Sequence, residues 1–159
     1  MKNKGFTLVE LLIYTVIVAS VGAMIVQTLV SVTTAQQKIE AREIVDENLD
    51  FALKKIGQSI KAASSIIGTP SNTLTLTING ETVEYSLSLG ILQKEVEGVD
   101  IPITSDKVIV SANNGNLFTK IDNSLTIHTI QIKIKVEYDS DDLKLSNIKS
   151  EVQTTVGLR

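Results

Sequence analysis

The chain has 159 residues, one histidine, no cysteine and a formal net charge of −3. This length suits one modest domain and excludes a second core of similar size. Without cysteine and with a single histidine, the chain can build neither a disulfide nor a zinc cluster nor a thiol redox pair. The acidic balance, with no lysines clustered around aromatic residues, argues against direct nucleic-acid binding.

The first predicted element is an apolar helix at residues 6–32. Its only charged side chain is Glu10. A helix of this length measures about 40 Å, because each residue adds about 1.5 Å, and the hydrocarbon layer of a bilayer is only ~30 Å thick. Lys2 and Lys4 precede the helix, and positive charge marks the cytoplasmic side. We therefore expect a single-pass membrane segment with the N-terminus inside.

The start of this helix carries a specific pattern, Lys4-Gly5-Phe6-Thr7-Leu8-Val9-Glu10. It resembles the class III signal of type IV pilins and type II secretion pseudopilins. The resemblance implies that residues 1–5 are a leader, cut off after Gly5 by a prepilin peptidase. It also implies that the new N-terminal Phe6 is methylated, that the helix stays in the mature protein, and that Glu10 serves filament assembly.

The same resemblance implies a structural subunit of a pilus or pseudopilus, with no enzymatic activity and no cofactor. Its implied partners are the prepilin peptidase, other pilin or pseudopilin subunits, the assembly platform in the cytoplasmic membrane, and membrane lipid. The protein would pass from the cytoplasmic membrane into a cell-surface or periplasmic filament. Losing Lys2 and Lys4 would lower the net charge from −3 to −5.

Glu10 is also a candidate site on physical grounds. A carboxylate in an apolar helix costs free energy unless it finds a partner. In a staggered bundle of helices, that partner would be the free amine that cutting after Gly5 creates on a neighbouring subunit. Cutting and assembly would then be coupled. The alternative is that Glu10 lies at headgroup depth and reaches water.

Two other fates of the apolar segment stay open. An ordinary secretory signal also begins with lysines and ends at small residues such as those at 19–23, which would release a soluble binding protein. A helix that is not cut would instead tether an extracellular adhesin or receptor domain and keep Met1. The N-terminus of the mature protein separates these fates from assembly.

Residues 33–68 are predicted to continue the helix in amphipathic form. Apolar residues recur at steps of three and four from Val45 to Ile67, and nothing definite stops the pattern before Gly68. This apolar stripe should pack on the chain's own sheet or on a neighbouring subunit. Asp50 and Lys54 have the spacing of a favourable ion pair. The charged residues opposite the stripe are Glu40, Glu43, Glu47, Asp50, Lys54 and Lys61.

Residues 69–159 are predicted to form an antiparallel β domain. Alternating residues at 74–78 and 83–89 flank Asn79-Gly80, which is typical of a hairpin. Residues 98–102 are interpreted as a loop. Further strands are predicted at 107–112, at 117–121 and in a long strand ending at Tyr138. A long helix packed on an antiparallel sheet gives an α+β class and is the pilin fold.

The remaining polar residues give weaker signals. His128 is interpreted as a surface strand residue, although a Ser-His-Asp triad stays formally possible. The acidic cluster Asp139–Asp142 has oxygen ligands for calcium but lacks the spacing and closing glutamate of a calcium loop. We interpret the cluster as a solvated turn between two strands and predict no metal site.

Two short stretches resemble minor subunits of the J-type pseudopilin or W-type minor pilin kind. They are Ile103–Val108, ahead of a buried strand, and Gln153–Arg159 at the C-terminus. This resemblance implies a place at or near the filament tip.

Overall fold

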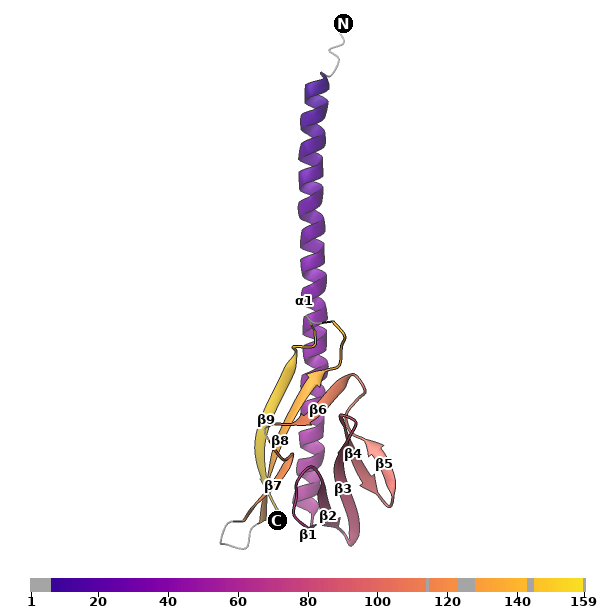
Figure 1. The fold of residues 1–159 in the computed structure, drawn as a ribbon, viewed down its shortest axis with the longest axis vertical. Helices are drawn as coiled ribbons and strands as arrows, with labels where there is room; N and C mark the ends of the chain where they lie inside the picture. The colour runs from indigo at the N-terminus through magenta and orange to yellow at the C-terminus, as the bar shows by residue number, and fades with distance from the viewer. Residues whose placement is uncertain (1–6, 114, 123–127, 143–144, 159) are drawn as a thin grey trace. The chain divides into compact units, whose positions relative to one another are not determined.

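The computed structural model describes residues 7–113, 115–122, 128–142 and 145–158. These residues form one long helix followed by nine strands, in the order α1 to β9 (Figure 1). The chain divides into two compact units, residues 1–39 and residues 40–159. The class is α+β, with a long N-terminal helix and antiparallel sheets, as predicted.

Helix α1 runs from Leu8 to Ala62, and its first 32 residues belong to the unit of residues 1–39. Almost every side chain in that part is exposed. By length and composition this is a helix that can cross a membrane, and none of its most apolar window is buried within the protein. The unit therefore has no core of its own.

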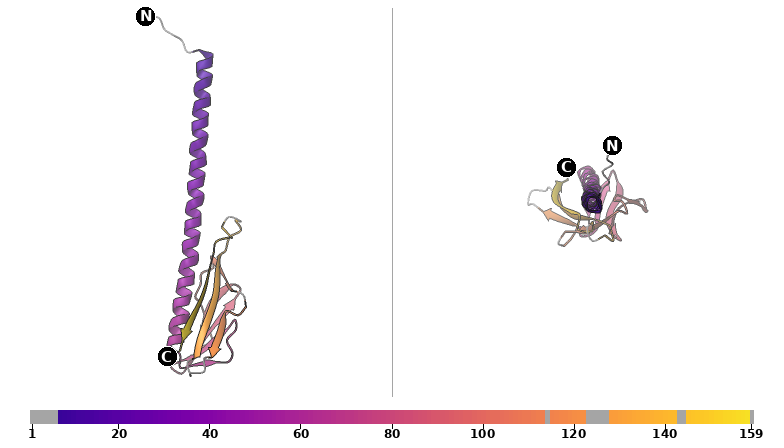
Figure 2. Two further views of the ribbon diagram at one scale, coloured as in Figure 1. Left: turned by 90° about the vertical axis from the view of Figure 1, so that its left-hand side faces the viewer. Right: turned by 90° about the horizontal axis from the view of Figure 1, so that it is seen from above.

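In the unit of residues 40–159, the rest of α1 lies against the sheets (Figure 2). Its buried residues follow the predicted steps of three and four and pack on the chain's own strands. Buried side chains from strands of both sheets belong to the same core. The buried residues on α1 are Ala41, Val45, Leu49, Ala52, Ile56 and Ile60.

The helix ends at Ala62, so the predicted continuation to residue 68 is wrong. A short strand, β1 (Ser65–Ile67), takes the place of the last predicted turns. The Ser64 backbone N–H and hydroxyl both donate to the carbonyl of Thr77, at 2.8 and 3.1 Å. Serine competes well for backbone partners, and β-branched isoleucine favours a strand. Pairing with the neighbouring strand thus replaces the helical hydrogen bonds here.

The first sheet is an antiparallel meander of five strands in sequence order. The predicted hairpin is confirmed, because Asn79 and Gly80 both have positive φ, as a type I′ turn requires. After β1, the strands are β2 (Leu74–Ile78), β3 (Glu81–Ser88), β4 (Ile91–Val96) and β5 (Val99–Pro102).

Strand β5 corrects the loop predicted at residues 98–102. Glu97 and Gly98 have positive φ and turn the chain tightly, so that β5 pairs back onto β4. All four residues of β5 are exposed. Because this edge strand buries neither face, its sequence has no apolar alternation to indicate a strand.

The second sheet is built around the longest strand, β8. One edge of β8 pairs with β9, and the other pairs with β7 along its first half and β6 along its second half. Alternate residues of β8 from Ile130 to Val136 are buried, as its sequence pattern predicts. The bounds are β6 (Val108–Ala112), β7 (Phe118–Asp122), β8 (His128–Tyr138) and β9 (Lys149–Gly157).

Candidate assembly site

Glu10 lies in the first turn of α1 and forms a capping box with Thr7. The Thr7 hydroxyl accepts a hydrogen bond from the Glu10 backbone N–H at 3.2 Å. The Glu10 carboxylate accepts in return from the Thr7 backbone N–H and hydroxyl, both at 3.1 Å. Each residue satisfies a backbone donor of the other, as in the capping box of helix N-termini. The pair fixes where the helix begins.

This geometry gives Glu10 a local role that the sequence analysis missed. A threonine followed three residues later by glutamate, ahead of an apolar run, is the sequence signal of a capping box. The carboxylate also lies at the N-terminal end of α1, which is the positive end of the helix dipole. Both described hydrogen bonds to the carboxylate end on Oε2. Gly5 and Phe6, the predicted cleavage and methylation residues, lie outside the described residues.

The serine and threonine hydroxyls from Thr15 to Thr34 are satisfied within the helix. Each donates to a backbone carbonyl three or four residues earlier, at 2.7 to 3.0 Å. Such bonds matter in hydrocarbon, where an unpaired polar group is costly. This surface can therefore be covered by lipid or by other apolar helices. The residues are Thr15, Ser20, Thr28, Ser31, Thr33 and Thr34.

The N-terminal segment also matches a known family model. Residues 1–26 match the model described as the prokaryotic N-terminal methylation motif. The chain carries a prepilin-type signal. No curated protein and no solved structure matches the chain.

The prepilin-type signal is that of the type IV pilin and pseudopilin superfamily, whose members are structural subunits rather than enzymes. It implies processing by a prepilin peptidase and assembly with pilins. The match covers residues 1–26 alone, and the apolar helix α1 that continues from it is able to cross a membrane by length and composition.

The other predicted polar sites do not gather into a reactive centre in the described part of the chain. No group of three or more histidine or acidic side chains there is arranged to hold a metal ion. Ser140 accepts a hydrogen bond from the Asp142 backbone N–H at 3.1 Å, which shapes a turn after β8. The side chain of His128, the first residue of β8, lies outside the described residues.

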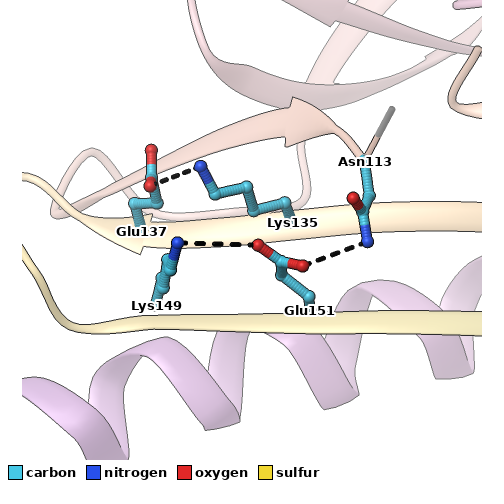
Figure 3. Close-up of polar contacts among 5 residues, drawn as sticks. All are labelled: Asn113, Lys135, Glu137, Lys149 and Glu151. Carbon is cyan, nitrogen blue, oxygen red and sulfur yellow. Dashed lines mark hydrogen bonds and ion pairs between the residues drawn. The ribbon is translucent and has the colours of Figure 1, made fainter. Parts of the chain in front are cut away.

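A polar cluster on β8 and β9 stabilises the second sheet (Figure 3). Lys135 pairs with Glu137 at 2.6 Å, and Lys149 pairs with Glu151 at 3.9 Å. Asn113 donates to the Glu151 carboxylate at 3.2 Å. The hydrogen bond that the Lys135 ammonium donates to the Glu137 carboxylate raises the pKa of Lys135. These charges alternate across the two strands and favour one register over a slipped one.

Tyr85 joins the first sheet to the helix inside the core. Its phenol oxygen lies 2.7 Å from the Ser59 hydroxyl on α1. Burial raises the pKa of Tyr85 above its usual 10.0, although the hydrogen bond with Ser59 acts in the opposite direction. The pair is a packing and orienting contact between α1 and β3.

A groove lies between one flank of α1 and the chain that follows β5. It has a volume of about 510 Å³, and Ile44, Phe51 and Ile103 supply apolar wall. Asn48 on α1 accepts a hydrogen bond from the Ser105 backbone N–H at 2.8 Å. Thr104 accepts another from the Leu92 backbone N–H at 3.0 Å. These bonds give Thr104 and Ser105, within the predicted minor-subunit stretch at 103–108, a packing role.

Proposed function

We propose that this protein is a structural subunit of a type IV pilus or of a type II secretion-like pseudopilus. A prepilin peptidase cuts it after Gly5, Phe6 becomes the methylated N-terminus, and α1 remains as the assembly helix. Lys2 and Lys4 hold the uncut leader on the cytoplasmic side, so residues 40–159 face outward. The assembly platform in the cytoplasmic membrane then adds the subunit to the filament.

One observation carries this proposal: the prepilin-type signal leads directly into a helix surface that the protein leaves uncovered. Burying apolar area from water gains about 25 cal/mol per Å², so such a surface does not stay in water. Lipid covers it before assembly, and the apolar helices of other subunits replace the lipid in a filament.

Glu10 is the proposed assembly residue. Cutting after Gly5 places a positive amine next to the positive end of the helix dipole, which is unfavourable without a nearby carboxylate. The two described hydrogen bonds of Glu10 use Oε2. We propose that Oε1 receives the amine of a neighbouring subunit, while the bond from the Thr7 backbone N–H keeps the carboxylate oriented.

The assembly test compares three variants by the yield of filaments sheared from cells and by the intact mass of the membrane-bound chain. Glu10→Leu and Glu10→Gln both remove the charge, so we expect filaments to be lost while cutting after Gly5 continues. Thr7→Val is the matched control, because it removes the side-chain half of the capping box and keeps the carboxylate. Filaments should persist in that control. Normal filament yield from Glu10→Gln would overturn the assembly role.

A minor subunit near the filament tip is the finer form of the proposal. It rests on the resemblance of residues 103–108 and 153–159 to J-type and W-type subunits. Counting copies of this chain per filament by quantitative mass spectrometry tests it. A tip subunit is present in very few copies, whereas a shaft subunit is the most abundant protein of the filament.

A further inference from the structure

The edges of the two sheets differ in how far they are closed. An edge strand presents unpaired backbone N–H and C=O groups, and proteins usually blunt such edges because another chain can pair with them. The first sheet has β1 at one edge and β5 at the other. The second sheet has β6 and β7 along one edge and β9 along the other (Figure 1). The backbone hydrogen bonds show which of these edges stays open.

The edges of the first sheet offer little to a partner strand. Strand β1 is three residues long. Next to β5, the Ile103 N–H donates to the Leu92 carbonyl on β4 at 2.8 Å. Because the direction of the backbone groups alternates along a strand, Asp100 and Pro102 of β5 point theirs outward. Proline has no N–H, so β5 offers a partner a single donor.

The edge formed by β6 and β7 is closed by the first part of the same unit. The Val110 N–H of β6 donates to the Gly90 carbonyl at 2.7 Å. The Phe118 N–H of β7 donates to the Ser71 carbonyl, also at 2.7 Å. Both donors point away from β8, because the residues on either side of them are the ones that bond to β8. Other segments of this chain therefore occupy this edge.

Strand β9 is a long edge that stays open. It has nine residues, and β8 is its strand partner in the described part of the chain. The Tyr138 N–H donates to the Ile148 carbonyl at 2.9 Å, so the even-numbered residues of β9 direct their backbone groups towards β8. The odd-numbered residues direct theirs outward. Among the described residues, the backbone groups of Glu151, Gln153 and Thr155 have no hydrogen-bond partner.

The sequence of β9 also favours pairing with a further strand. Val152–Val156 contains no proline, glycine or charged residue, and valine and threonine are strong strand formers. Val152 and Val156 pack against the core but are only partly buried. The two charged residues of β9, Lys149 and Glu151, pair with each other at 3.9 Å. An added strand would gain backbone hydrogen bonds and would cover more of both valines.

A second copy of this chain is a poor occupant for the β9 edge. This step rests on the proposed function, because copies rooted in one membrane all enter it in the same direction. Their β9 strands then run the same way and cannot meet as the antiparallel pair of a twofold dimer. The other edges of a copy are short, end in proline or are already occupied. The occupant therefore comes from a different protein.

We propose that the outer edge of β9 is a strand-addition site for an extended segment of another protein. The segment has no proline in its paired stretch and places apolar side chains at alternate positions, beside Val152 and Val156. Its backbone supplies most of the recognition, as in other cases where a peptide extends a sheet. At about 3.4 Å per residue, the nine residues of β9 offer about 30 Å of pairing.

Hydrogen exchange with a probe peptide tests the site. The probe alternates valine and threonine over the length of β9 and carries a lysine at each end for solubility. The full-length chain is held in detergent micelles, and the exchange of single backbone amides is followed by NMR. We expect the probe to slow exchange at Glu151, Gln153 and Thr155 at least about tenfold. The amides of Val152 and Thr154 already face β8, so their exchange should change much less.

A proline substitution tests whether the outward N–H groups carry the binding. Gln153→Pro removes one outward donor and no hydrogen bond to β8, which copies the place of Pro102 at the β5 edge. We expect its affinity for the probe to fall at least about tenfold, while the unfolding midpoint in denaturant stays close to that of the wild type. Gln153→Thr is the matched control, because it keeps the N–H, and it should bind like the wild type. A folded Gln153→Pro chain that binds equally well would overturn the inference.

Two methylated probes test the same point on the wild-type chain, so the result does not depend on how Gln153→Pro folds. With its valines on the side of the core, the probe directs the N–H groups of its threonines towards β9. N-methylation of the threonines should therefore abolish protection of the β9 amides, whereas N-methylation of the valines should preserve it. Equal protection by both methylated probes, or none by the unmodified probe, would contradict strand addition.

The concentration of the chain separates a different partner from a second copy. Protection of Glu151, Gln153 and Thr155 that rises with chain concentration, without any probe, would identify a second copy and overturn the inference. Intact mass separates the inference from the proposed function, because the solubilised chain binds the probe whether or not it is cut after Gly5. A wild-type chain that is never cut overturns the proposed function. A cut chain whose β9 amides the probe does not protect overturns the strand-addition site alone.

Discussion

The two units of this chain differ in what covers their apolar side chains. In residues 40–159, the apolar face of α1 is buried against strands of the same molecule. In residues 8–39, apolar side chains surround the helix, and no other residue that the structure describes buries them. Residues 8–39 therefore need lipid or other subunits to cover them, whereas residues 40–159 fold on their own core. One continuous helix belongs to both.

Truncating an isoleucine to alanine should have the largest effect on stability, and only in the unit that buries it. Ile56 is 0% exposed, and Ile56→Ala should lower the free energy of unfolding of residues 40–159 by about 2–5 kcal/mol. Ile17 is 52% exposed, and Ile17→Ala should change that free energy by less than about 0.5 kcal/mol. Denaturant unfolding of the full chain in detergent micelles measures both. Equal losses would contradict a division into a packed unit and an unpacked one.

Tyr85→Phe should have an intermediate effect on the free energy of unfolding, and this effect should depend on pH. Below pH 10 the variant should be less stable than the wild type by about 1 kcal/mol, because the hydrogen bond with Ser59 is lost. The raised pKa means that folded Tyr85 holds its proton more tightly than unfolded Tyr85 does. Wild-type stability should therefore fall as pH rises above 10.0 towards the pKa of the folded state.

The variant lacks this ionisation, so its stability should fall less over the same range. Unfolding by denaturant at pH 8 and at pH 10.5 measures the difference. Ser59→Ala is the control, since it removes the same hydrogen bond and keeps the phenol. Parallel pH profiles for the wild type and Tyr85→Phe would show that this ionisation is not coupled to folding.

The smallest effect is expected on the outer face of the second sheet. Lys135→Gln removes the short ion pair with Glu137, and Lys149→Gln removes the longer pair with Glu151. We expect Lys135→Gln to lower the free energy of unfolding slightly and Lys149→Gln to lower it less, because the pair of Lys149 and Glu151 is more exposed and less closely spaced. Both losses should disappear near 1 M salt, where the Debye length is about 3 Å. Losses that salt does not change would indicate packing rather than charge.

The elements that the sequence predicts well are those in which one local signal determines the structure. The β2–β3 hairpin follows from alternation around Asn79-Gly80, and the long strand β8 follows from its regular apolar face. The end of α1 was missed because no glycine or proline marks it. Hydrogen bonds to Thr77, which is distant in sequence, stop the helix instead.

The candidate site was predicted only in part. The signal around Gly5 was identified from its residues, and the family model that matches residues 1–26 supports it. The cut after Gly5, the methylation of Phe6 and the assembly role of Glu10 remain predictions. The local partner of Glu10, Thr7, is present in the sequence as a capping box, a signal that neither the assembly role predicted for Glu10 nor its alternative of reaching water includes.

The central claim is that the chain is cut after Gly5 and keeps its apolar helix. The most direct test is the intact mass and N-terminal peptide of the protein from membranes of cells with and without the prepilin peptidase. We predict a chain that begins at methylated Phe6 only when the peptidase is present. A chain that begins at Met1 in both, or near Met24 after ordinary secretion, would contradict the claim.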